Sequence, residues 1–133
     1  MTVGRLFVFS LLVVSLSGVA VEAAPRRSAT RLPKEQADFF EQRIRPVLIH
    51  HCYQCHSGDP AKAKGHFVLD TWAGLRKGGE SGVAIVPGKP DNSPLVEAVK
   101  YESLEMPPQG KLPDEVIADL VHWVEMGAPD PRV

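Results

Sequence analysis

The chain has 133 residues, which suits a single domain, and its formal net charge is −1. Charges this well balanced provide no basic surface for nucleic acid, so we expect no nucleic-acid partner. Charged residues make up 23% and hydrophobic residues 44%, as in an ordinary soluble protein.

The first residues have the pattern of an export signal. Residues 6–21 are almost uninterruptedly apolar, Arg5 precedes them, and small residues follow. Val21 and Ala23 suit the −3 and −1 positions of a signal-peptide cleavage site, which predicts a signal peptide over residues 1–23. The alternative is an uncleaved membrane anchor, although the stretch is short for a span of about 20 residues. We therefore expect a periplasmic or otherwise extracytoplasmic protein that meets a membrane only transiently, or through an uncleaved signal segment.

The mature chain begins with a polar stretch and continues into one folded domain. Residues 24–33 are rich in Pro, Arg and Ser, which predicts a flexible leader. The folded domain is expected over residues 34–133. A helix is predicted over residues 34–45, because Phe39, Phe40 and Ile44 recur at near-helical spacing. Pro46 is expected to end or kink this helix, or to begin a short turn over residues 47–51.

The two cysteines of the chain lie in the string Cys-Tyr-Gln-Cys-His over residues 52–56. This C-x-x-C-H spacing is the attachment signature of a c-type haem. Cys52 and Cys55 would form thioether bonds to the haem vinyl groups, and His56 would be the proximal ligand of the iron. The cofactor prediction is therefore one haem c.

Two other kinds of site share part of this pattern. A zinc site needs a second ligand pair, and the chain has no further cysteine and no suitably spaced histidine pair downstream of the string. A thioredoxin-like redox motif should open a helix after a strand, and the flanking residues do not have that pattern.

Short elements and loops are expected in the middle of the chain. Residues 57–65 are polar and contain glycine and proline, which predicts a loop. Asp70 is expected to cap a short helix over residues 71–76. A glycine-rich loop at residues 77–82 lacks the Lys-Ser/Thr of a phosphate-binding loop. After a turn at residues 87–90, Ser93 and Pro94 are expected to start a helix that runs to about Lys100.

The clearest helix is predicted over residues 114–126. Its apolar residues fall on one stripe, and Gly127 followed by Pro129 provides a C-terminal stop. With two longer helices at its ends, short ones between them and little strand signal, the domain is predicted to be all-α. A core of this size is marginal alone, and a buried haem would add much apolar contact.

The second axial ligand is predicted to be Met106, which is followed by two prolines in a loop between two predicted helices. A stiff loop can hold a thioether sulfur against iron, although most methionines simply pack. His66 is the best alternative ligand. His50 and His51 are too near His56 in sequence to reach the opposite face easily, and His122 is expected to face solvent or pack.

These motifs together resemble the planctomycete-type cytochrome c domain. The resemblance covers residues 39–131 and rests on the following matches: Ile44-Arg45-Pro46-Val47-Leu48, the Cys52–His56 string, Phe67-Val68-Leu69-Asp70, Gly78-Gly79, Ile85-Val86-Pro87-Gly88-Lys89-Pro90, Ser93-Pro94-Leu95, Met106-Pro107-Pro108, Lys111-Leu112, Trp123 and Gly127-Ala128-Pro129. It implies a small, predominantly helical cytochrome c fold, covalent haem, His56 and Met106 as axial ligands, and electron transfer.

The chain departs from this family in two respects. Such domains usually lead a much longer protein, so this chain is either a stand-alone carrier or a truncated product. Pro113 stands where a Ser or Thr cap is usual, and we expect Asp114 to take over the cap.

We therefore expect a monomeric, exported electron carrier with unknown donor and acceptor proteins and no enzymatic activity. Its haem would be held by Cys52, Cys55, His56 and Met106. Arg76 or Lys77 is a candidate partner of the haem propionates, although simple surface charge is the alternative for both. The rival interpretation is a haem-based sensor or docking module of a larger assembly, which requires an open sixth position on the iron. A disulfide oxidoreductase or a zinc protein without haem is a third interpretation.

Overall fold

The computed structural model describes Met1 and residues 32–132 of the chain. The predicted signal peptide and nearly all of the predicted leader lie outside the described residues, so both stay predictions. Among the described residues, none of the helices combines the length and the hydropathy that a membrane span requires.

The N-terminal helical run is longer than the sequence indicates. It continues from Lys34 to Cys52 through four consecutive segments: α1 (Lys34–Phe39), η1 (Phe40–Ile44), α2 (Arg45–Val47) and η2 (Leu48–Cys52). Pro46 therefore neither ends this helix nor begins a separate turn, and those two predicted alternatives are wrong, whereas a kink at Pro46 stays a prediction. Both η segments are wider π-helical turns, and the amide of Arg45 bonds to the carbonyl of Phe40, five residues back. We attribute the tolerance of Pro46 to this wider turn, which displaces the carbonyl that its ring would otherwise meet.

The middle of the chain forms the two predicted short helices, α3 (Trp72–Lys77) and α4 (Pro94–Lys100), and two single 3₁₀ turns, η3 (Lys64–His66) and η4 (Pro90–Asn92), that were not predicted. The cap of α3 differs from the prediction, because the Thr71 hydroxyl accepts a hydrogen bond from the Gly74 amide at 3.0 Å. Asp70 instead accepts from the Gly58 amide at 2.8 Å and ties the preceding loop to the start of this helix.

The last helix, α5 (Asp114–Glu125), follows the predicted pattern and stops at Gly127, whose φ is 95°. Asp114 is its first helical residue and forms no side-chain cap, which contradicts the predicted capping role. The Pro113 carbonyl accepts the amides of Val116 and Ile117, so the helix begins without a capping side chain.

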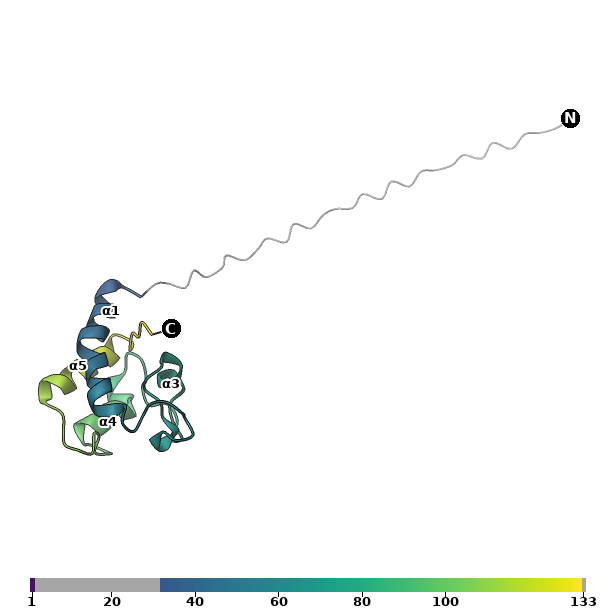
Figure 1. The fold of residues 1–133 in the computed structure, drawn as a ribbon. Coiled ribbons are helices and arrows are strands. Elements are labelled where there is room, and N and C mark those ends of the chain that lie inside the picture. Colours follow the sequence, from purple (N-terminus) through teal and green to yellow (C-terminus); the bar gives the residue numbers. More distant parts are fainter. Residues whose placement is uncertain (2–31, 133) are drawn as a thin grey trace. The chain divides into compact units, whose positions relative to one another are not determined.

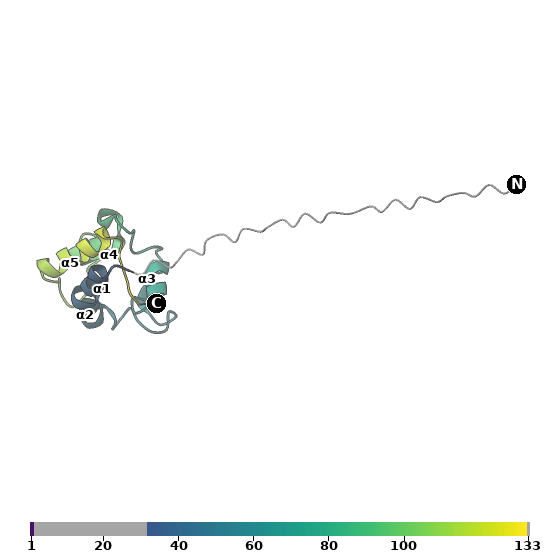
Figure 2. The ribbon, with the colours of Figure 1, turned by 90° about the horizontal axis from the view of Figure 1, so that it is seen from above.

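The core is formed where the N-terminal run, α4 and α5 meet. α5 packs against both η1 and α4, and Figures 1 and 2 show α4 and α5 side by side from two directions. Trp123 and Phe40 are fully buried, with ring centroids 5.9 Å apart. The Trp123 indole donates to the Pro129 carbonyl at 2.8 Å, so its one polar group is satisfied. An ion pair between Arg43 and Asp119, at 3.0 Å, lies beside this contact.

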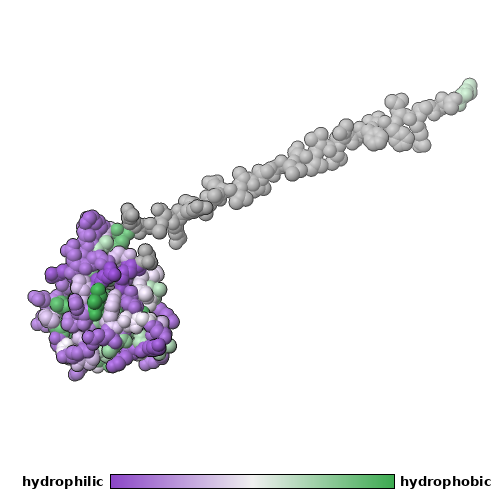
Figure 3. All heavy atoms as spheres, viewed as in Figure 1, coloured by the Kyte–Doolittle hydropathy of each residue, from purple (hydrophilic) through white to green (hydrophobic). Residues whose placement is uncertain are grey.

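Residues 32–132 contain no β-strand, only an isolated bridge between Gly79 and Gly82, and the all-α prediction is confirmed. The surface is mostly hydrophilic with scattered apolar residues, as Figure 3 shows for one face. Two of the exposed apolar side chains, Val83 and Leu104, also line the cavity described next.

Candidate haem site

The Cys52–His56 string folds as a helical turn that extends the N-terminal run. The amides of Cys55 and His56 both donate to the Cys52 carbonyl, at 3.1 and 3.0 Å. Residues three and four apart share one side of a helical turn. This turn therefore directs both sulfurs and the imidazole of His56 to the same side of the backbone.

The tautomer of His56 is fixed by its neighbour. Nδ1 of the ring lies 3.1 Å from the backbone carbonyl oxygen of Phe67. A carbonyl oxygen only accepts hydrogen bonds, so Nδ1 carries the proton and donates it. The lone pair of Nε2 is then left available as a metal ligand, in the arrangement that proteins use to orient ligating histidines.

Cys52 is placed where a thiolate is unfavourable. Burial raises the pKa of the Cys52 thiol to about 11. Reactive cysteines and zinc-binding cysteines need the thiolate, whereas a thioether sulfur is neutral and suffers little from burial. In addition, the described residues contain no group of three or more His, Cys, Asp and Glu side chains able to hold a metal ion. The donor set thus favours thioether attachment over a zinc or redox-thiolate site.

All four residues predicted to hold the haem line one cavity of about 420 Å³, within the usual range for cofactor sites. Cys52, Cys55 and His56 come from the end of the N-terminal run, and Met106 comes from the loop between α4 and α5. The cavity walls are largely apolar, with contributions from Leu48, Phe67, Leu69, Leu95, Val99 and Leu120. An apolar pocket with two thiols, an imidazole and a thioether fits a covalently attached haem.

One wall of the cavity depends on the close approach of two glycines, Gly65 and Gly79. The Glu80 amide donates to the Gly65 carbonyl at 2.8 Å and joins the 64–66 turn to the glycine loop. A Cβ atom on Gly79 would lie only 2.4 Å from that carbonyl oxygen. The sequence marks Gly79 as part of a loop but gives no sign of this contact.

We expect Gly79→Ala to destabilise the protein by about 1–3 kcal/mol, because the added methyl group forces the glycine loop away from the Gly65 carbonyl. Thermal unfolding of the haem-loaded protein measures the effect. Ser81→Ala, in an exposed position of the same loop, is the control and should change stability little. Equal stability of the two variants would contradict the proposed contact.

The other candidate side chains lie differently. His66 is exposed, its Nδ1 bonds to the Pro60 carbonyl at 3.0 Å, and it does not line the cavity. His51 does line the cavity. His122 is exposed and meets the Phe39 ring edge-on, in agreement with its predicted place.

The two cations considered for the propionates lie outside the cavity lining. The Arg76 guanidinium is 5.7 Å from the centre of the Trp72 ring, and neither it nor Lys77 lines the cavity. Lys64 does line the cavity and was not singled out from the sequence.

Sequence reasoning also missed a clamp on the far side of the attachment turn. The Arg132 guanidinium donates to the Tyr53 hydroxyl at 2.5 Å and to the Leu69 carbonyl at 2.9 Å. It pairs bidentately with Asp130, whose side chain is fully buried, and lies 4.9 Å above the centre of the Phe40 ring. The clamp therefore joins Tyr53, one of the two residues between the cysteines, to the C-terminal segment.

Comparison with known proteins agrees with this geometry. No curated protein and no solved structure matches the chain. Residues 52–110, which run from the attachment turn through Met106, match the family described as Planctomycete cytochrome C. The chain therefore contains a planctomycete-type cytochrome c domain, a module of haem-based electron transfer.

Proposed function

We propose that the protein is an exported carrier of single electrons that binds one haem c through Cys52 and Cys55, with His56 and Met106 as the two axial ligands. The observation that supports this proposal most strongly is the convergence of these four side chains on one apolar cavity. Met106 is 50 residues beyond His56 in sequence, so a shared cavity is not a consequence of local spacing.

Each residue has a distinct role in this proposal. A bound haem c supplies an iron that changes its charge by one electron. The two sulfurs hold the group in place, and the Phe67 carbonyl orients the His56 ring toward it. The apolar walls exclude water, and a neutral sulfur ligand favours the ferrous state, so both raise the reduction potential. With both axial positions filled by protein, the site passes electrons without binding a substrate, and we propose no enzymatic activity.

The compartment and the partners follow from the same proposal. Cytochrome c domains are typically extracytoplasmic, and the apolar residues 6–21 behind Arg5 support export by a signal peptide. We propose that a monomer exchanges electrons there with donor and acceptor proteins.

The test of this function is covalent attachment. We expect the double variant Cys52→Ala, Cys55→Ala to lose the mass increment of one haem and the pyridine haemochrome spectrum after maturation in the periplasm. Gln54→Ala, an exposed position inside the same turn, is the matched control and should retain both. Wild-type protein with no tetrapyrrole mass after acid–acetone extraction would refute the proposal.

A further inference from the structure

The end of α4 has an unusual residue at its turn. Tyr101 follows the helix in the left-handed conformation, with φ 66° and ψ 33°. The Glu102 amide donates to the Glu97 carbonyl at 2.9 Å, and the Tyr101 amide donates to the Ala98 carbonyl at 3.2 Å. These two bonds form a Schellman motif, in which the left-handed position is usually glycine.

The end of α5 has the same motif with the expected residue. There Gly127 takes the left-handed position, and its amide and that of Ala128 bond to Val124 and Trp123, at 3.0 and 2.9 Å. A side chain in this conformation costs free energy that glycine does not. The tyrosine at the end of α4 is therefore strained, and a strained residue is a reason to look for a function of its side chain.

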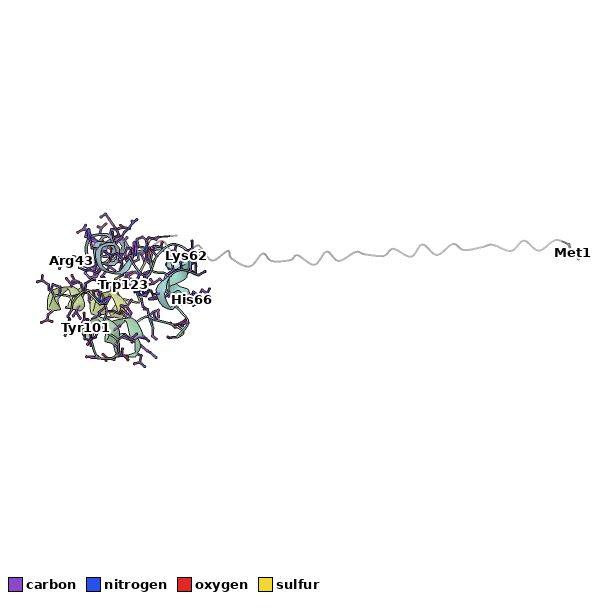
Figure 4. The ribbon with its side chains drawn as sticks, turned by 60° about the horizontal axis from the view of Figure 1, so that its bottom comes forward. Met1, Arg43, Lys62, His66, Tyr101 and Trp123 are labelled. Atoms are coloured by element: carbon purple, nitrogen blue, oxygen red, sulfur yellow. The ribbon has the colours of Figure 1, made fainter. Side chains whose placement is uncertain are left out.

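The side chain of Tyr101 reaches the loop that carries Met106. Its hydroxyl donates to the carbonyl of the buried Pro107 at 2.6 Å. On the other side of the methionine, the Met106 amide donates to the Ala98 carbonyl at 3.2 Å, the oxygen that also accepts the Tyr101 amide. The backbone on both sides of Met106 is thus fastened to the end of α4. Figure 4 labels Tyr101 and His66 on different parts of the domain.

We propose that Tyr101 is a positioning residue that holds the Met106 sulfur in the cavity through its hydroxyl bond to Pro107. This inference rests on the proposed function, in which Met106 is an axial ligand. A neutral thioether is a weak ligand, so its bond to iron depends on a loop that keeps it in place. The left-handed turn aims the Tyr101 ring at the loop, and the phenol supplies the bond.

The test compares haem-loaded variants of the two tyrosines of the chain. Tyr101→Phe keeps the ring and the strained turn but removes the hydroxyl, whereas Tyr101→Gly removes the ring and relieves the strain. Imidazole competes with Met106 for the ferric iron, so its affinity reports how firmly the sulfur is held. We expect both variants to bind imidazole about tenfold more tightly, the equivalent of one lost hydrogen bond, and to weaken the far-red band of a methionine–iron(III) bond.

Tyr53→Phe is the matched control. It removes the hydroxyl that accepts from Arg132, so it lowers stability while leaving the imidazole affinity and the band as in the wild type. If Tyr101→Phe and Tyr101→Gly bind imidazole as the wild type does, while Met106→Ala binds it much more tightly, the positioning role is wrong and the ligand assignment stands. If Met106→Ala changes neither the band nor the imidazole affinity, the ligand assignment fails, and the role of Tyr101 fails with it.

Discussion

Replacing Met106 with alanine is expected to lower the reduction potential by tenths of a volt, a substantial part of the ~0.8 V range that axial ligands span in haem proteins. The sulfur is neutral and favours the ferrous iron, so its loss removes that preference and admits water to the sixth position. The variant should retain covalent haem, lose the far-red band in the ferric state and bind carbon monoxide rapidly in the ferrous state. Spectroelectrochemistry and flash photolysis measure these changes.

Met126 provides the matched control for this experiment. It lies beyond the end of α5 and does not line the cavity. Met126→Ala should therefore keep the reduction potential of the wild type, its far-red absorbance band in the ferric state and its slow binding of carbon monoxide in the ferrous state. If wild-type ferrous protein binds carbon monoxide as rapidly as Met106→Ala does, the sixth position is open, which contradicts the carrier function and favours a haem-based sensor.

Replacing Arg132 with methionine is expected to destabilise the haem-loaded protein by about 3–5 kcal/mol, because the buried Asp130 carboxylate loses its partner. The same change also removes the bonds to the Tyr53 hydroxyl and the Leu69 carbonyl. For a domain of this size, the midpoint of thermal unfolding should fall by more than about 10 °C. Urea denaturation and calorimetry measure the loss, and Arg132→Lys should recover little of it, since lysine cannot form the bidentate pair.

Two further variants separate this effect from a general loss of charge. Adding Asp130→Asn to Arg132→Met removes the unpaired charge and should recover part of the stability. Lys34→Met breaks an exposed pair with Asp38 and should change stability by less than about 1 kcal/mol. If Arg132→Met is no more destabilising than Lys34→Met, the Arg132 clamp contributes nothing to the stability of the folded protein.

The attachment turn was predictable because its chemistry is contained in five consecutive residues. The spacing of Cys52, Cys55 and His56 identifies the ligand type, and one helical turn suffices to bring the three side chains together. Met106 could also be predicted as a ligand from the sequence, since two prolines after a methionine indicate a stiff loop. The prediction that all four meet at one site agrees with the cavity that they line.

Contacts between distant segments were not predictable in this way. Arg132 and Tyr53 are 79 residues apart, and no local pattern links a C-terminal arginine to an attachment turn. Some local predictions failed because a neighbour competed for the same role. Thr71 replaced Asp70 as the cap of α3, since Asp70 instead bonds to the Gly58 amide. Pro46 remained inside a helix because π-helical turns flank it, a geometry that the hydrophobic spacing does not reveal.

The burial of Cys52 has a consequence for the order of maturation. Because burial raises its pKa to about 11, the Cys52 thiol of the folded protein is almost entirely protonated near neutral pH. A protonated thiol is a poor nucleophile, because the thiolate is the reactive form. We therefore expect the apoprotein to accept its cofactor as an open chain, with folding completed only after the Cys52 sulfur has reacted.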